Sequence, residues 1–158
     1  MNVPSNCQTV KTNRAAIDII KKHETFRYNF YDDGAKYRTI GYGHNCDVHD
    51  CSKIQPPIIL AYGEKLLKED LVEAERCVIK NTKFKLNSNQ FSALVSFIFN
   101  LGCTKYKSST LLSKLNAGKT KGASTEFGQY IHANNKVSKD LKVCREKERK
   151  LFCKSGGC

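Results

Sequence analysis

The sequence predicts an α+β fold that is mostly helical and has one small antiparallel sheet near the N-terminus. Two observations support this prediction. Apolar residues recur at helical spacing over most of the chain. The segment "NFYDDGAKYRTIGYGH" differs, because Asp33-Gly34 is a hairpin-type turn signal between β-prone residues. The 158 residues match the usual size of one domain, and no repeat or linker divides them.

The N-terminal third contains the first predicted helix and the sheet. The helix covers residues 13–24, with Asn13 as its cap. Its apolar stripe consists of Ala16, Ile19 and Ile20. In the sheet segment, Gly41 and Gly43 allow close approach of the backbone to other groups.

The remaining elements are helices. Residues 61–80 form a long amphipathic run that would span roughly 27 Å, enough to bridge two lobes. Its shared apolar face consists of Leu67, Leu71, Ala74 and Val78. The segment "NSNQFSALVSFIFNLG" is apolar on most sides and predicts a buried helix, with Asn87 and Gln90 as a capping pair and Gly102 as its end. Three shorter helices follow, in "SSTLLSKLNAG", "STEFGQYIHA" and "SKDLKVCREKERKLF".

Cysteine content and charge restrict the class of protein. Eight cysteines at this density are typical of disulfides in an oxidising compartment, and the alternative is a set of free thiols with a metal site. The net charge of +12 is concentrated in residues 103–158, where 13 lysines and arginines face four acidic residues. Such a basic face attracts nucleic acid, membrane surfaces or bacterial walls, or it serves solubility alone.

The most specific feature is the spacing of polar residues after the first helix. Glu24 ends that helix, Asp33 follows at the hairpin turn, and Thr39 lies on the return strand. A helix end followed by a tight hairpin can place two carboxylates across a cleft, and glycoside hydrolysis needs such a pair. Taken singly, each residue also fits an ordinary role as a solvated glutamate, a turn aspartate or a β-prone threonine.

Together with "TIGYGH" at residues 39–44, this spacing resembles the catalytic signature of the phage-type lysozyme family. The resemblance covers about residues 14–152, because four later helical segments also have counterparts in that family. These segments are "KLLKEDLVEAERCV", "LNSNQFSALVSFIFNLGC", "SSTLLSKLNAG" and "REKERKLF". Cysteines stand where the secreted, fungal-type muramidases of the family have them, so the closest resemblance is to that branch. They are Cys46, Cys51, Cys77 and Cys103.

The resemblance implies one lysozyme-like domain over residues 1–158. Its small lobe would cover about 25–60, its inter-lobe helix about 61–80, and its helical lobe about 81–158 together with the helix at about 13–24. It also implies hydrolysis of the β-1,4 bond between N-acetylmuramic acid and N-acetylglucosamine, with inversion at the anomeric carbon.

The same resemblance assigns roles to single residues. Glu24 would be the general acid, and Asp33 with Thr39 would position or activate the water. Tyr31 and Asn100 match positions that face the sugar cleft. The chain departs from the family in three ways: Thr25 replaces a frequent glycine, there is no tryptophan, and only Arg145 remains of an arginine run before the last helix.

The segment "HNCDVHDC" offers a competing metal site. His44, Cys46, His49 and Cys51 are four possible zinc ligands within eight residues. Structural zinc sites usually draw their ligands from more widely spaced pairs, so we expect a disulfide there and no metal or other cofactor. His44 is then a residue that locks the fold beside the sheet, and His49 is a loop residue.

We expect all eight cysteines to be oxidised, with Cys46–Cys51 and Cys77–Cys103 as two of the pairs. Cys144 and Cys153 would lie about 13.5 Å apart along one helix, too far for a disulfide. Cys7 therefore pairs with Cys144 or with Cys153, and Cys158 takes the other, provided that these four pair among themselves.

Three functions are compatible with the sequence. The first is a secreted, monomeric muramidase acting on anionic bacterial peptidoglycan, either outside the cell or in a phagosomal or lysosomal lumen, with its signal peptide removed. The second is a catalytically inactive cationic wall-binding or antimicrobial protein on the same fold, which would not need the set of Glu24, Asp33 and Thr39. The third is a nucleic-acid binder, which the absence of any recognised motif disfavours. No apolar run is long enough to serve as a membrane anchor.

Overall fold

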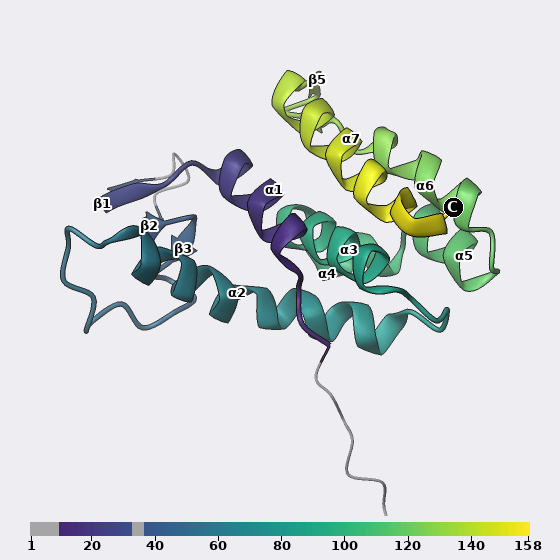
Figure 1. Cartoon of the computed structure of the whole chain (residues 1–158). Helices are drawn as coiled ribbons and strands as arrows, with labels where there is room; N and C mark the ends of the chain where they lie inside the picture. Colours follow the sequence, from purple (N-terminus) through teal and green to yellow (C-terminus); the bar gives the residue numbers. More distant parts are fainter. Residues whose placement is uncertain (1–9, 33–36) are drawn as a thin grey trace, which may run out of the picture.

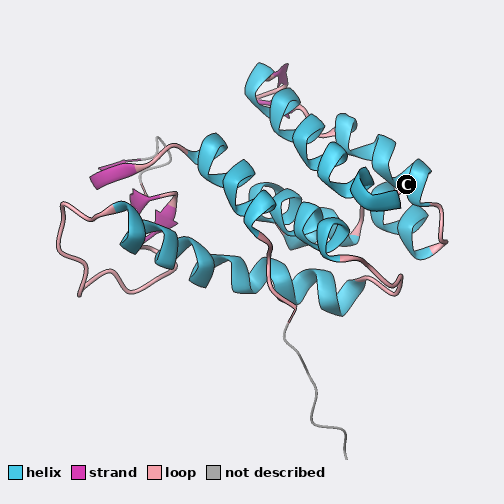
Figure 2. Ribbon diagram, viewed as in Figure 1, coloured by secondary structure: helices cyan, strands magenta, loops and turns pink. Residues whose placement is uncertain are grey.

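The computed structural model describes residues 10–32 and 37–158. It is α+β and mostly helical, as predicted. The sheet lies at one end of a long helix, α1 lies between the sheet and the remaining helices, and these lie toward the opposite end (Figures 1 and 2). The α-helices are α1 (Arg14–Glu24), α2 (Leu60–Asn81), α3 (Ser88–Leu101), α4 (Cys103–Lys107), α5 (Thr110–Asn116), α6 (Thr120–Glu126) and α7 (Lys139–Cys153). The 3₁₀ turns are η1 (Phe127–Gln129) and η2 (Lys154–Gly156). The strands are β1 (Arg27–Asp32), β2 (Arg38–Gly41), β3 (His44–Asn45), β4 (His132–Ala133) and β5 (Lys136–Val137).

The N-terminal sheet is antiparallel, in the order β1-β2-β3. Thr39 is its central residue, because it lies opposite Tyr31 on one side and Asn45 on the other. Residues that lie directly opposite each other on adjacent strands share a face of the sheet. The side chains of Thr39, Tyr31 and Asn45 therefore lie on one face.

The predicted helix caps are present. The side chain of Asn13 accepts a hydrogen bond from the backbone N–H of Ala16, and Asn87 with Gln90 forms a reciprocal capping box. Gly102 ends α3 at a φ of 88°, as predicted, and Ser138, which was not predicted as a cap, caps α7 by accepting from Leu141 N–H. Each cap satisfies backbone groups that a helix end leaves unpaired. Sequence alone therefore places these helix ends to within about a residue.

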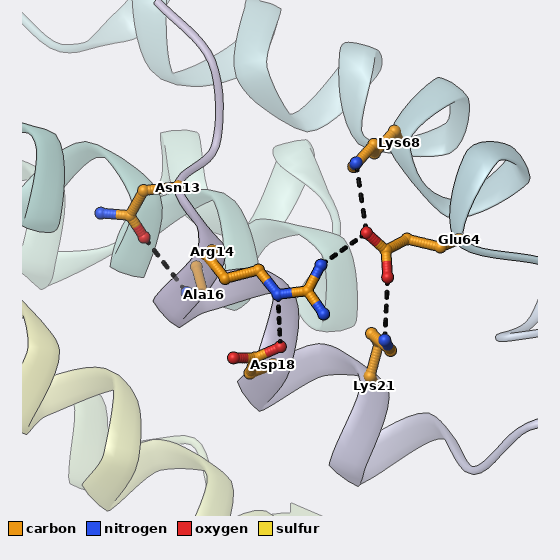
Figure 3. Close-up of polar contacts among 7 residues, drawn as sticks. All are labelled: Asn13, Arg14, Ala16, Asp18, Lys21, Glu64 and Lys68. Carbon is orange, nitrogen blue, oxygen red and sulfur yellow. Dashed lines mark hydrogen bonds and ion pairs between the residues drawn. The ribbon is translucent and has the colours of Figure 1, made fainter. Parts of the chain in front are cut away.

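A charged cluster fixes α1 against the first turns of α2 (Figure 3). The carboxylate of Glu64 accepts hydrogen bonds from Arg14 Nη1 at 2.6 Å and from Lys21 Nζ at 2.8 Å, and Lys68 Nζ lies 3.2 Å from it. The hydrogen bond from Lys21 lowers the pKa of Glu64 to about 2. The cluster contacts both the first turn and the C-terminal half of α1, which ends at Glu24, and so holds the helix in place.

Within residues 10–32 and 37–158, the apolar core consists of two clusters, both of which include residues of α2. The larger cluster lies among α1, α2, α3, α5 and α7 and includes the predicted stripe Leu67, Leu71, Ala74 and Val78. The smaller cluster underlies the sheet and the loop after it, and it consists of Ile40, Cys51, Ile54, Ile58 and Leu66. Among the described residues, no helix is long and apolar enough to cross a bilayer.

The predicted helix at residues 124–133 is wrong. The chain forms α6 earlier, passes through η1, and then makes the two-stranded β4–β5 hairpin. Asn134 and Asn135 form the turn of this hairpin with φ values of 50° and 60°. Asparagine tolerates such positive φ values well, so the pair Asn-Asn is a hairpin signal that outweighs the apolar spacing around it.

Candidate active site

Glu24 stands at the last position of α1, where the chain turns into the sheet. Its side chain is partly buried, and desolvation raises the pKa of its carboxyl above the ordinary value of 4.5. A carboxyl of this kind keeps its proton to higher pH than a solvated glutamate does, which suits a general acid.

Thr25 makes the turn after Glu24. It has φ 54° and ψ 126°, a region that β-branched residues rarely occupy. Phe26 then packs onto α2 at Gly63, where a Cβ would overlap the Phe26 ring. The Phe26 ring also lies 4.9 Å from that of Tyr42. The strained turn and the packed ring together fix the direction of the chain next to Glu24.

Gly43 brings the backbone close to the Glu24 carboxyl. A Cβ at Gly43 would lie 3.4 Å from Glu24 Oε2, and the φ of 89° also favours glycine at this position. Gly43 lines a cavity of about 520 Å³ between the β3 region, α2 and the α3–α4 junction. The cavity is also lined by Asn45 and Phe99, and it is large enough for a small ligand.

The predicted partners of Glu24 are described only in part. Asp33 lies outside the described residues. Thr39 is 3% exposed, and its hydroxyl donates to the carbonyl oxygen of Tyr37 at 3.1 Å. Because that bond uses the hydroxyl proton, the oxygen can still accept a hydrogen bond from water.

The two predicted sugar contacts lie on different elements. Tyr31 is opposite Thr39 in the sheet, and the Arg27 guanidinium lies 5.4 Å from the centroid of its ring. Asn100 is exposed near the end of α3, next to the cavity residue Phe99. The structure thus brings Tyr31 and Thr39 together in the sheet, whereas Asn100 lies on α3, among the helices.

A buried network supports Asn100, and the sequence did not predict it. Arg145 on α7 donates from Nη2 to Asn100 Oδ1 at 3.0 Å, and its Nε lies 3.0 Å from Glu148 Oε2. Ser96 Oγ donates to Glu148 Oε1 at 2.7 Å. Arg145 and Glu148 are 1% and 0% exposed. A signal was available, because Ser92, Ser96 and Asn100 form a polar stripe along an otherwise apolar helix.

His44 has the fold-locking position that we expected. It is buried, and its Nδ1 lies 2.9 Å from Asp70 Oδ1 on α2. His49 is more than a loop residue, because its Nε2 lies 3.2 Å from the same Asp70 oxygen. Cys46 and Cys51 form a disulfide, so the predicted alternative of a zinc site with two thiolate ligands is not available.

Three disulfides are present in the described part of the chain: Cys46–Cys51, Cys77–Cys103 and Cys153–Cys158. The first two are the pairs that we expected, and the third is one of the two alternatives left open. Cys144 is a buried thiol whose pKa burial raises to about 11. Its remaining partner by that scheme, Cys7, lies outside the described residues.

Comparisons with known proteins are consistent in family and in fold. The Phage lysozyme family matches residues 21–148. The endolysin of Bacillus phage B103 is 42% identical over 142 residues, which are 88% of this chain and 52% of the endolysin. A P22 lysozyme mutant superposes with a TM-score of 0.81 at 30% identity, covering 90% of this chain and 97% of that one. The muramidase domain of SpmX from Asticaccaulis excentricus superposes with a TM-score of 0.80 at 28% identity, with the same coverage of both chains.

Proposed function

The chain belongs to the phage lysozyme family, and on this premise we propose that it hydrolyses the β-1,4 bond between N-acetylmuramic acid and N-acetylglucosamine in bacterial peptidoglycan. The observation that carries the proposal is the carboxyl of Glu24. It is partly buried at a helix end, its pKa is raised by desolvation, and it lies against the Gly43 backbone beside a cavity. Because the chain spans 52% of the B103 endolysin, the activity of that longer protein does not transfer without a test.

In the proposed reaction, protonated Glu24 donates to the glycosidic oxygen as the bond to the leaving sugar breaks. Asp33 accepts a proton from water that attacks the anomeric carbon from the opposite face, and Thr39 holds that water. Attack from the opposite face inverts the configuration and needs room for water between sugar and base. The two carboxyls are therefore expected to lie about 6.5–9.5 Å apart when substrate is bound.

Tyr31 and Asn100 are the proposed sugar contacts. Tyr31 shares a sheet face with Thr39, which supports a position beside the attacking water. The amide of Asn100 is held by Arg145, and such an anchored side chain loses little entropy when it binds a sugar hydroxyl.

Replacement of the acid tests the proposal. Glu24→Gln removes the proton donor and keeps the shape, so clearing of a bacterial wall suspension should slow by several orders of magnitude, with unchanged circular dichroism. Glu69→Gln is the matched control, because Glu69 is an exposed carboxylate on α2. Asp33→Asn should be severe and Asp32→Asn mild. Clearing by Glu24→Gln at the wild-type rate would refute the assignment of the acid.

An inactive, cationic wall-binding protein on the same fold is the second candidate function. The basic surplus of residues 103–158 favours it, and Lys105, Lys107, Lys119 and Lys121 are all exposed. If the protein is a binder, the Glu24→Gln variant should agglutinate or inhibit bacteria as well as the parent protein does. In an enzyme, the same charge would recruit it to anionic walls, so lysis of whole cells should weaken with added salt while cleavage of short neutral chitooligosaccharides should not.

The setting of the proposed enzyme is extracytoplasmic, either outside the cell or in a phagosomal or lysosomal lumen. Three disulfides support this, because such bonds persist in oxidising compartments. The positions of Cys46, Cys51, Cys77 and Cys103 support a place near the secreted, fungal-type muramidases within the family. The proposed working form is a monomer with a small lobe around the sheet and a larger helical lobe, joined by α2.

A further inference from the structure

Two imidazoles and a carboxylate meet beside the cavity, on the face of α2 that the loop after β3 covers. The rings of His44 and His49 stack with centroids 4.7 Å apart and an interplanar angle of 20°. His44 Nδ1 lies 2.9 Å and His49 Nε2 lies 3.2 Å from the same oxygen of Asp70. One possible ligand atom from each of the three residues lies within 4.8 Å of the others.

Local structure holds the three groups in place. The Cys46–Cys51 disulfide closes the loop that carries His49, directly after His44, and thereby restricts the position of His49 over His44. Asp70 comes from the middle of α2, and its side chain is 8% exposed. His49 is the most accessible member, with a side chain that is 38% exposed. The side chains of His44 and Asp70 are therefore buried, whereas that of His49 is open to solvent.

The ligand types favour a first-row transition metal over magnesium or calcium. Imidazole nitrogens suit zinc, copper and nickel, whereas magnesium and calcium prefer oxygen ligands. Ligands at zinc distances in a tetrahedral arrangement are roughly 3.3 Å apart. The separations of 2.9 and 3.2 Å from Asp70 are close to this value, and the two histidine nitrogens, which lie within 4.8 Å of each other, would move together to admit an ion.

We propose that His44, His49 and Asp70 bind one zinc ion or a similar divalent transition metal. The fourth ligand would be water from the cavity of about 520 Å³, which His49 and Asp70 line. Because Arg76, Lys80 and Lys107 line the same cavity and outnumber Glu73, the affinity must come from direct coordination and not from the surrounding field. The ion would cross-link the loop after β3 to α2, and none of its ligands belongs to the proposed catalytic set.

Titration of the intact, oxidised protein with zinc chloride in a calorimeter tests this proposal without reference to hydrolysis. One ion per chain is expected. Thermal unfolding with zinc at about 100 times its dissociation constant should shift upward by about 5 °C or more, and excess EDTA should reverse the shift. Absence of stoichiometric binding would show that the three groups share only protons and hydrogen bonds, and would overturn the proposal.

Variants identify the ligands. His49→Gln should abolish the calorimetric signal while the protein stays folded, because His49 is partly exposed and lies outside the apolar core. Asp70→Asn should also abolish it. His132→Gln is the matched control, since His132 is exposed on the distant β4 strand, and it should bind normally. Binding that survives His49→Gln, or that is lost in His132→Gln, would place the ion elsewhere and refute the site.

Discussion

The backbone of Gly43 lies against the carboxyl of Glu24, so that a Cβ added to Gly43 would lie 3.4 Å from Oε2. Gly43→Ala places a methyl group in van der Waals contact with the proposed acid and strains a backbone at φ 89°, so that relaxation of the strained backbone should shift the carboxyl. We expect a loss of about 1 kcal/mol in unfolding free energy and a loss of about tenfold or more in wall clearing, because small misplacements of a reacting group are costly.

Gly118→Ala is the control for backbone strain. Gly118 has a comparable φ of 75°, and no atom lies within 4 Å of its virtual Cβ. Both variants should lose similar stability, measured by urea unfolding, but only Gly43→Ala should lose activity. Equal losses of activity would mean that contact with Glu24 is unimportant.

The raised pKa of Glu24 should appear in activity and in stability. The general acid must be protonated, so activity should fall as pH rises through this pKa, and the fall should occur above the range of a solvated glutamate. The folded-state pKa lies above the unfolded one, so the contribution of Glu24 to stability is fully present below about pH 4.5 and is lost as pH rises through the folded value.

The linkage predicts a result for Glu24→Gln that can be measured without substrate. The variant should unfold at an equal or higher temperature than the parent at pH 7, and the difference should disappear below about pH 4. Glu69→Gln, on the exposed face of α2, should show no such pH-dependent difference. A Glu24→Gln variant that is clearly less stable at pH 7 would contradict the desolvation of this carboxyl.

Thr25 carries strain that glycine would relieve. Its φ of 54° with ψ 126° costs about 1–3 kcal/mol for a residue of this kind, whereas the added entropy of glycine in the unfolded chain costs about 0.5–1 kcal/mol. Thr25→Gly should therefore raise the unfolding free energy, by up to about 2 kcal/mol. Thr25→Ala should gain less, because it keeps a Cβ. Thermal melts of both variants decide the matter, and a lower melting temperature for Thr25→Gly would show that the turn is unstrained.

Local features of the fold and of the site could be predicted because they depend on neighbours in sequence. Asn13 and Asn87 signalled helix starts, and the spacing from Glu24 to Thr39 signalled a helix end followed by a hairpin. The β4–β5 hairpin was missed because residues 124–133 were read as a helix, and the turn signal of the two asparagines directly after it was given no weight. Its turn chemistry outweighed that pattern.

Contacts between distant segments could not be predicted from one sequence. Arg145 reaches Asn100 across 45 positions, and the contact depends on how α3 packs against α7. His49 reaches Asp70 only because the disulfide loop folds back over α2. No fixed separation in sequence predicts either contact, because tertiary packing decides which faces of the helices meet.

The buried pair Arg145 and Glu148 offers a test of this packing. Burial raises the pKa of Glu148 to about 7, although the Arg145 charge acts in the opposite direction. Arg145→Met would leave Glu148 without its cation and should cost about 3–5 kcal/mol at pH 8. The cost should be smaller at pH 5, where Glu148 can take up a proton.

The double variant Arg145→Met, Glu148→Leu should recover most of that loss, because apolar replacement of a whole buried pair is often neutral. The control is Arg149→Met, which removes an exposed partner of Glu146 at the same spacing on α7 and should cost no more than about 1 kcal/mol. Denaturant unfolding of the parent, Arg145→Met, Glu148→Leu and the double variant gives the coupling energy. Additive losses would show that Arg145 and Glu148 do not act as a pair.

The last prediction concerns Cys144, which is a buried free thiol in the structure and which the pairing scheme joins to Cys7 in the oxidised protein. Cys153–Cys158 is formed, so the pairing scheme leaves Cys7 for Cys144. Cys144 lines a cavity of about 270 Å³ together with Ile19 and His23, which offers room for a second sulfur. A link between residues 7 and 144 closes a loop of more than 100 residues, and the chain-entropy model gives it about 4–5 kcal/mol. Non-reducing peptide mapping should yield a cross-linked peptide containing both cysteines. Cys7→Ser, Cys144→Ser and the double variant should lose equal stability, because each removes the same bond. A Cys144 that is alkylated only after unfolding, with Cys7 reduced or linked elsewhere, would show that Cys144 is a buried free thiol.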